Sequence, residues 1–227
     1  MIRGKIVRHL RLLSMLVLFA SEVSAADLSG TLRLFANGKP LRESEAAEAI
    51  IYFRPATPVP VQPAGEPAVM STRRKQFVPR VLAITVGDSV RFPNEDPILH
   101  NAFSTSPENA FDTGQYSRGE GRTQMFSKAG LVRVYCNVHH SMFGFVLVLD
   151  TPFHTRADAS GRFRLNGLPA GEGELVVFHD RGAPLRQQLA VGEGSRIELK
   201  LDLNKRRVPE HSNKFGKPYV KKRNGRY

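Results

Sequence analysis

The chain has 227 residues and a formal net charge of +12, and its length suits one large or two small domains. Most of the excess charge lies at the C-terminus, where residues 204–227 carry nine Lys and Arg against one Glu. Residues 1–25 hold four more basic residues against one Glu, so the body from 26 to 203 is close to neutral. A basic tail on a neutral body is not a DNA-binding face, so we expect no nucleic-acid partner.

The N-terminus has the pattern of a secretory signal peptide over residues 1–25. A basic start at 3–11 precedes an apolar stretch at 12–20 and small residues at 23–25. The apolar stretch is short for a bilayer span, which favours cleavage near Ala25 over a retained membrane tether. The sequence therefore predicts an exported protein, located in the periplasm or an equivalent compartment.

Apolar residues alternate with polar ones along much of the chain, which is typical of β-strands with one buried face. Strands are expected around residues 32–34, 82–86, 90–92, 132–136, 145–149, 163–165, 175–178 and 197–203. The run at 145–149 is continuously apolar, as in a strand buried on both faces. Only residues 43–49 suggest a helix, so the sequence predicts an all-β fold.

Linkers divide the chain into segments. Five prolines lie between residues 55 and 67, and a second break falls near residue 151. They bound residues 62–150, a normal length for a Greek-key β-sandwich. The flanking pieces 27–54 and 153–203 are each too short to bury much core alone. We expect these pieces to pair as a second small β-sandwich with the central segment inserted. The alternative is a tandem arrangement in which the N-terminal piece packs beside the central segment.

Cys136 is the only cysteine, and it begins the run Cys136-Asn-Val-His139-His140-Ser-Met142. In an oxidising compartment a lone cysteine forms no internal disulfide, which leaves a core thiol, a reactive thiol or a protected metal ligand. His100 lies upstream, after a strand-like segment. Two imidazoles, a thiolate and a thioether are the ligands of a mononuclear blue-copper site.

The composition and spacing of the run indicate which histidine is the ligand, and they count against other kinds of metal site. Cys-x2-His favours His139 as the second imidazole, with His140 as the alternative ligand. Met142 counts against structural zinc, which is held by Cys and His without a thioether. The sequence has no second cysteine for a binuclear copper centre, no His-x-His pair and no Gly-x-Ser-x-Gly turn, so we expect no enzymatic activity.

Residues 70–150 resemble the plastocyanin/amicyanin branch of the cupredoxins. The resemblance is carried by Val86-Gly-Asp-Ser-Val-Arg-Phe-Pro-Asn-Glu-Asp, by His100-Asn and by Cys136-x2-His139-x2-Met142. It implies a type 1 copper held by these two histidines, the cysteine and the methionine. It also implies that Asn101 joins the two ligand loops by hydrogen bonds, a task that orients the ligands.

A second resemblance concerns the flanking pieces. The run Asp158-Ala-Ser-Gly-Arg-Phe-Arg-Leu-Asn-Gly-Leu-Pro-Ala-Gly, together with Gly30-Thr-Leu, is similar to the carboxypeptidase regulatory-like (transthyretin-type) β-sandwich. That family part is non-catalytic, which agrees with the absence of a protease motif from the sequence.

The preferred function is an exported electron carrier with one type 1 copper. Its partners would be redox proteins such as a c-type cytochrome or a periplasmic dehydrogenase. We expect residues 204–227 to be a disordered basic extension, with steering toward an acidic partner or an anionic membrane surface as its functional alternative. Two other functions stay open: periplasmic copper binding or delivery without redox turnover, and a copper-free β-sandwich interaction protein.

Overall fold

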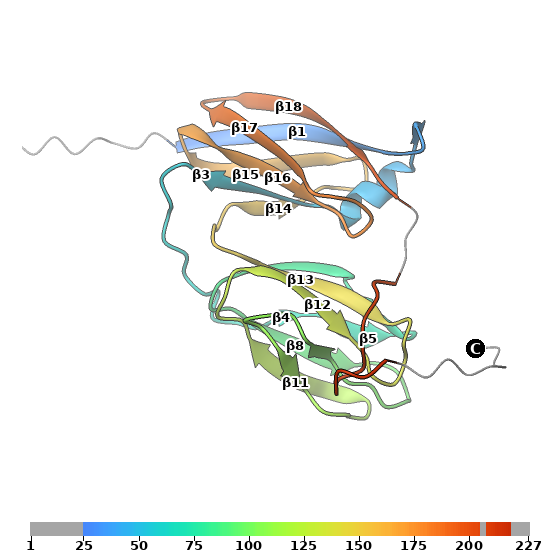
Figure 1. Ribbon diagram of the computed structural model, residues 1–227. Coiled ribbons are helices and arrows are strands. Elements are labelled where there is room, and N and C mark those ends of the chain that lie inside the picture. The colour runs from blue at the N-terminus through green and yellow to red at the C-terminus, as the bar shows by residue number, and fades with distance from the viewer. Residues whose placement is uncertain (1–24, 205–207, 219–227) are drawn as a thin grey trace, which may run out of the picture.

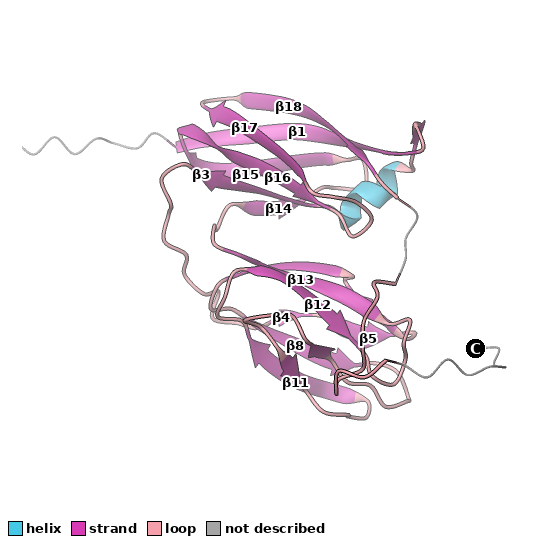
Figure 2. Cartoon of the chain, viewed as in Figure 1, coloured by secondary structure: helices cyan, strands magenta, loops and turns pink. Residues whose placement is uncertain are grey.

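The computed structural model describes residues 25–204 and 208–218, which form an almost entirely β structure (Figure 1, Figure 2). The predicted all-β fold is therefore confirmed. In the described part of the chain the one helix is a 3₁₀ helix, η1 (Glu43–Glu48), within the segment expected to be helical. The described residues contain no helix of the length and apolarity that a membrane span requires. Apart from Ala25, the predicted signal peptide lies outside the described residues.

The outer sandwich is formed by the first and last strands of the described chain. Its strands are β1 (Ala25–Ala36), β2 (Lys39–Pro40), β3 (Ile50–Pro55), β14 (His154–Arg156), β15 (Arg162–Pro169), β16 (Gly171–Phe178), β17 (Leu185–Val191) and β18 (Ser195–Asp202). One sheet has the order β15-β1-β18, with β2 on β1, and the other has the order β14-β3-β16-β17. Strands that precede and follow the intervening sequence thus share both sheets. The domain boundaries and the regulatory-like assignment stay predictions.

The central sandwich is formed by the strands between these groups. They are β4 (Ala68–Val69), β5 (Ser71–Arg73), β6 (Gln76–Val78), β7 (Val81–Thr85), β8 (Ser89–Asn94), β9 (Phe103–Ser104), β10 (Phe111–Asp112), β11 (Gly119–Met125), β12 (Gly130–Tyr135) and β13 (Phe143–Leu149). One sheet runs β10-β9-β12-β13-β7, and the other runs β11-β8-β5-β6 with β4 beside β8. Side chains from both sheets form its core, which includes Phe77, Phe92, Val134 and Cys136.

An apolar layer joins the two sandwiches. Strand β13 is buried at every position because its side chains alternate between two cores. Val146 and Val148 enter the core of the central sandwich, whereas Phe145 and Leu147 face the outer sandwich. The side chains of strand β3 also alternate, between the core of the outer sandwich and the layer that joins the two sandwiches. This alternation explains why successive residues of β3 are apolar. The run at 145–149 was predicted to be buried on both faces, and it is.

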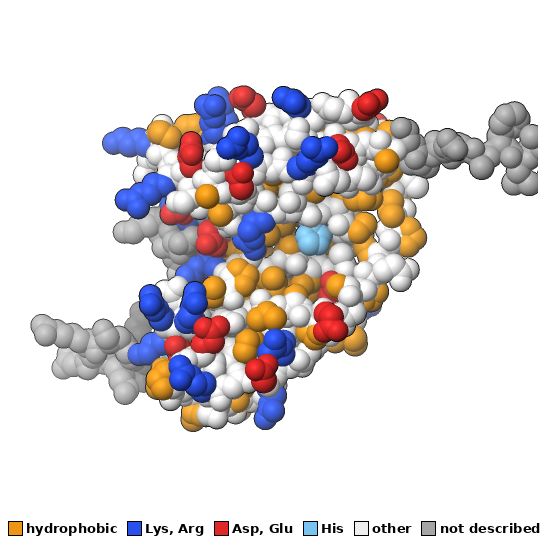
Figure 3. Space-filling model, turned by 180° about the vertical axis from the view of Figure 1, so that it is seen from behind, with side chains coloured by type: hydrophobic (Ala, Val, Ile, Leu, Met, Phe, Trp, Pro, Cys, Tyr) orange, Lys and Arg blue, Asp and Glu red, His pale blue; other side chains and the backbone are white. Residues whose placement is uncertain are grey.

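Charged side chains of both signs are interspersed over both sandwiches on the face seen in Figure 3. Some form pairs, such as Arg54 Nε with Asp150 Oδ1 at 2.9 Å and Arg186 Nη1 with Glu174 Oε2 at 2.9 Å. Pairs at such solvent-exposed positions contribute little to stability. The apolar cores and the layer between the sandwiches therefore supply most of the stabilisation.

Replacing a side chain of this layer tests its contribution. The ring of Phe145 packs edge-on against Phe143 and Phe178, at centroid distances of 5.9 and 6.0 Å. Phe145→Ala should lower the free energy of unfolding by about 3–5 kcal/mol, because it leaves a cavity between the sandwiches. Phe215→Ala is the matched control, since that ring is 73% exposed. Chemical denaturation that gave equal stabilities for both variants would contradict this packing.

Candidate metal centre

Cys136 is placed in the central core by the strand that precedes it. Side chains alternate along β12, so Val132, Val134 and Cys136 share the inward face, and the cysteine is 0% exposed. A tight turn follows, in which Met142 N donates to His139 O at 2.9 Å and Cys136 N donates to Met142 O at 3.2 Å. These hydrogen bonds fold residues 136–142 into a loop, and strand β13 begins at the next residue.

His100 reaches the same point from the loop between β8 and β9. Its backbone forms a bridge with Tyr116: His100 N donates to Tyr116 O at 3.2 Å, and Tyr116 N donates to His100 O at 2.9 Å. The imidazole is 0% exposed. A strand-like bridge therefore anchors this histidine independently of the cysteine loop.

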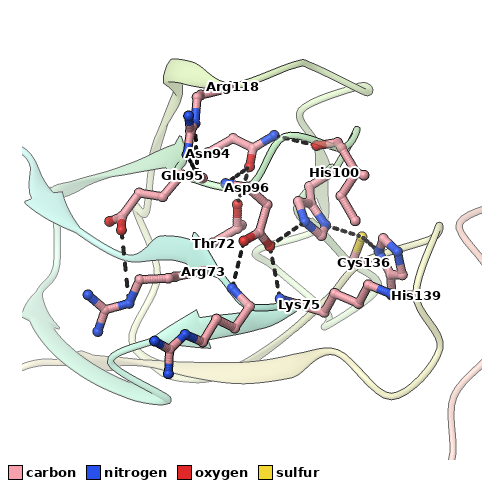
Figure 4. Close-up of polar contacts among 12 residues, drawn as sticks. Thr72, Arg73, Lys75, Asn94, Glu95, Asp96, His100, Arg118, Cys136 and His139 are labelled. Atoms are coloured by element: carbon pink, nitrogen blue, oxygen red, sulfur yellow. Dashed lines mark hydrogen bonds and ion pairs between the residues drawn. The ribbon is translucent and has the colours of Figure 1, made fainter.

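The two histidines and the cysteine converge on one point, as Figure 4 shows. Cys136 Sγ lies 3.6 Å from His100 Nδ1 and 3.9 Å from His139 Nδ1. An ion about 2.3 Å from the sulfur and about 2.0 Å from each nitrogen, with bond angles near 120°, would leave about 3.7 Å between sulfur and nitrogen. The two observed sulfur–nitrogen distances bracket this value, and the three ligand atoms all lie within 4.8 Å of one another.

The other predicted residues of the loop occupy different positions. Met142 is 1% exposed and belongs to the same core cluster as Cys136. Its role as the axial ligand stays a prediction. His140 lies on the exposed side of the loop, outside the group formed by His100, Cys136 and His139. Together with Lys75, Val138, His139 and Ser141 it lines a surface hollow above the site.

Asn101 links the two loops that carry the cluster. Its side-chain Oδ1 accepts the backbone N–H of Asn137 at 2.8 Å, and its Nδ2 donates to Asp112 Oδ1 at 3.0 Å. Oδ1 also lies 3.7 Å from Cys136 Sγ. The contact between the His100 loop and the Cys136 loop is the one that the cupredoxin resemblance implied for Asn101.

Asp96 is a site residue that sequence reasoning missed. Its Oδ2 lies 2.9 Å from His100 Nε2, and the carboxylate also accepts the backbone N–H groups of Arg74 at 2.7 Å and Lys75 at 2.9 Å. A carboxylate on Nε2 fixes the ring and leaves Nδ1 free for a metal. Its position four residues before His100 was the available signal, although the contact itself depends on how the loop folds.

The electrostatics favour a thiolate at Cys136. Burial would raise the pKa of the thiol, but hydrogen bonds from His100 and from backbone N–H groups of the ligand loops lower the pKa overall. For His100, burial would lower the pKa, yet the bonds to Cys136 and Asp96 raise it. Burial and the nearby His100 lower the pKa of His139, which keeps that imidazole neutral.

Comparison with solved structures finds cupredoxins at low identity over part of this chain. A Cu-containing nitrite reductase from Thermus scotoductus SA-01 matches at 29% identity and a TM-score of 0.35, covering 41% of this chain and 25% of that one. A purple cupredoxin from Nitrosopumilus maritimus matches at 23% and 0.33, covering 36% and 99%. An amicyanin mutant in its reduced state matches at 21% and 0.35, covering 44% and 98%. The chain thus spans about a quarter of the nitrite reductase. No protein-family model and no curated protein matches the chain.

The thiolate can be tested without metal. In the copper-free protein, the ultraviolet absorbance of the Cys136 thiolate should titrate at a lower pH than in the same chain unfolded in denaturant, where a free cysteine has a pKa near 8.5. His100→Ala should move the midpoint upward, because it removes the largest contact that lowers the pKa. Cys136→Ser supplies the blank. A folded-state midpoint at or above the unfolded one would contradict the assigned contacts.

Proposed function

We propose that the chain is an exported type 1 copper protein that carries single electrons between redox partners. The observation that carries the proposal is the convergence of Cys136 Sγ with His100 Nδ1 at 3.6 Å and His139 Nδ1 at 3.9 Å, inside an apolar core. The depth of Cys136 and the hydrogen bonds to it support a protected ligand rather than a reactive thiol.

The donor set supports copper over other metals. Thiolate and imidazole together suit copper or zinc, while carboxylate-rich sites suit magnesium and calcium. Met142 is buried in the same core cluster as Cys136, which supports the proposal that its thioether would be the weak axial ligand of a blue-copper site. A structural zinc site would be closed by a fourth Cys or His.

The surrounding residues suit a carrier whose geometry stays constant. Bound copper would supply the one-electron couple between Cu(I) and Cu(II). The Tyr116 bridge and Asp96 hold His100, the turn at 136–142 holds the cysteine, and Asn101 joins the two. His139 is the half-buried ligand that lines the surface hollow, so we assign it as the exit for the electron.

Location, partners and the absence of catalysis belong to the proposal. The predicted signal peptide supports export, with a c-type cytochrome or a periplasmic dehydrogenase as the partner class. The near-neutral body and the basic tail support electrostatic steering by residues 204–227 toward an acidic partner or an anionic membrane surface. One structural match is a nitrite reductase, so the expectation that the chain is not an enzyme stays a prediction.

Copper loading of the mature protein tests the ligand set. We expect one copper per chain and an intense visible thiolate-to-copper band, which Cys136→Ala abolishes. The adjacent histidines form a matched pair: His139→Ala should remove or strongly shift the band, and His140→Ala should leave it. Absence of the band from folded, copper-exposed protein, or its loss in His140→Ala alone, would reject the assignment.

The axial role of Met142 has a separate readout. Met142→Leu should keep the visible band but raise the reduction potential, because the lost thioether stabilises Cu(II) more than Cu(I). A tenfold loss of relative Cu(II) affinity corresponds to about 59 mV. Met125→Leu is the control, since that side chain is 60% exposed. Equal potentials for the two variants, measured by voltammetry, would remove Met142 from the ligand set.

A further inference from the structure

Part of the C-terminal tail lies against the metal-centre end of the central sandwich. Residues 208–218 run along the central sandwich (Figure 1). The imidazole of His211 stacks on the ring of Tyr135, with centroids 3.9 Å apart and planes inclined by 5°. Lys214 N donates to Asn137 Oδ1 at 3.2 Å, and Lys214 Nζ donates to Asp112 Oδ2 at 2.7 Å.

We infer that residues 208–218 form a C-terminal clamp that fixes the Cys136 loop, with Lys214 as its positioning residue. Tyr135 and Asn137 are the two neighbours of Cys136 in the chain. The clamp holds the first by a ring stack and the second by a hydrogen bond. Both residues that flank the candidate copper thiolate are therefore bound to the same segment, far away in sequence.

The hydrogen bonds of Lys214 close a ring that includes Asn101. Lys214 Nζ binds one oxygen of Asp112, the other oxygen accepts from Asn101 Nδ2, and Asn101 Oδ1 accepts from Asn137 N. Asn137 Oδ1 accepts a hydrogen bond from Lys214 N, which closes the ring. Displacement of Lys214 would remove one partner each from Asp112 and Asn137, and so would loosen the residue that ties the two ligand loops together.

Charge gives the clamp a second effect on the thiolate. The side chains of Lys214 and Asp112 are 25% and 33% exposed, so their pairing is partly shielded from water. Without Lys214, the negative charge of Asp112 would face Asn101, next to Cys136, without compensation. Loss of one positive charge near the site favours Cu(II) over Cu(I), so the reduction potential should fall. This electrostatic effect rests on the proposed copper function, whereas the clamp contacts do not.

The experiment compares Lys214→Met with Lys217→Met in the mature, full-length protein. Both changes remove one positive charge from the same segment, but Lys217 is exposed and its side chain lies outside the ring described above. In copper-free protein, hydrogen exchange of the Asn137 amide should accelerate about tenfold in Lys214→Met, as expected for loss of a partly buried charged hydrogen bond. Lys217→Met should stay within about twofold of the parent. Lys214→Arg, which keeps the charge, should restore most of the protection.

The copper-loaded variants supply the second readout. The reduction potential of Lys214→Met should fall below that of Lys217→Met, by a difference that shrinks as ionic strength rises. Equal Asn137 exchange in the two variants would overturn the clamp. Unequal exchange with equal potentials would overturn its action on the thiolate. If the parent shows no copper band, the exchange comparison still decides the clamp, so failure of the proposed function and failure of the clamp are separable.

Discussion

Burial of one sulfur between two imidazoles is the constraint on which the rest of this molecule depends. A thiolate in an apolar core is costly unless hydrogen bonds compensate its lost hydration. Here the compensation comes from His100 and from backbone N–H groups of both ligand loops, and it outweighs burial. Those groups stay in place only if the two loops are held firmly. Asp96, Asn101 and the bridge to Tyr116 are therefore part of the same arrangement as the ligands.

The two sandwiches contribute to this firmness through the alternation of strand side chains. At the end of β12, Tyr135 faces the layer between the sandwiches and Cys136 faces the central core. At the start of β13, Phe143 faces that layer and Met142 faces the core. Each end of the ligand loop is thus held by packing against the layer between the sandwiches and by packing in the central core. The outer sandwich supports the site by packing, although it supplies none of the three converging side chains.

Sequence reasoning predicted the features that depend on local spacing. The all-β fold, the doubly buried run at 145–149 and the short helical turn follow from periodicity. Strands β11 and β17 were missed because their side chains are mostly exposed and carry little apolar pattern. Strand β3 was missed too, although its apolar residues form a continuous run of the kind that was recognised at 145–149.

The residues of the site likewise include some that the sequence predicts and others whose contacts form only in the folded molecule. Cys136 and His139 lie three residues apart, so their proximity could be read from the chain. His100 was a candidate because its residue type completes the ligand set, and the family resemblance added the role of Asn101. Asp112 and Lys214 are 102 residues apart and meet only in the folded molecule. Nothing in a basic tail singles out one lysine as a partner of the ligand loop. Contacts of this kind are set by tertiary packing, which a single sequence does not display.

The most direct test of the central claim is X-ray absorption spectroscopy at the copper edge of the loaded protein. We expect one sulfur and two imidazole nitrogens in the inner coordination sphere, with the sulfur contribution lost in Cys136→Ala. A copper environment made only of nitrogen and oxygen in the parent protein would contradict it, because the buried thiolate would then have no part in binding the ion.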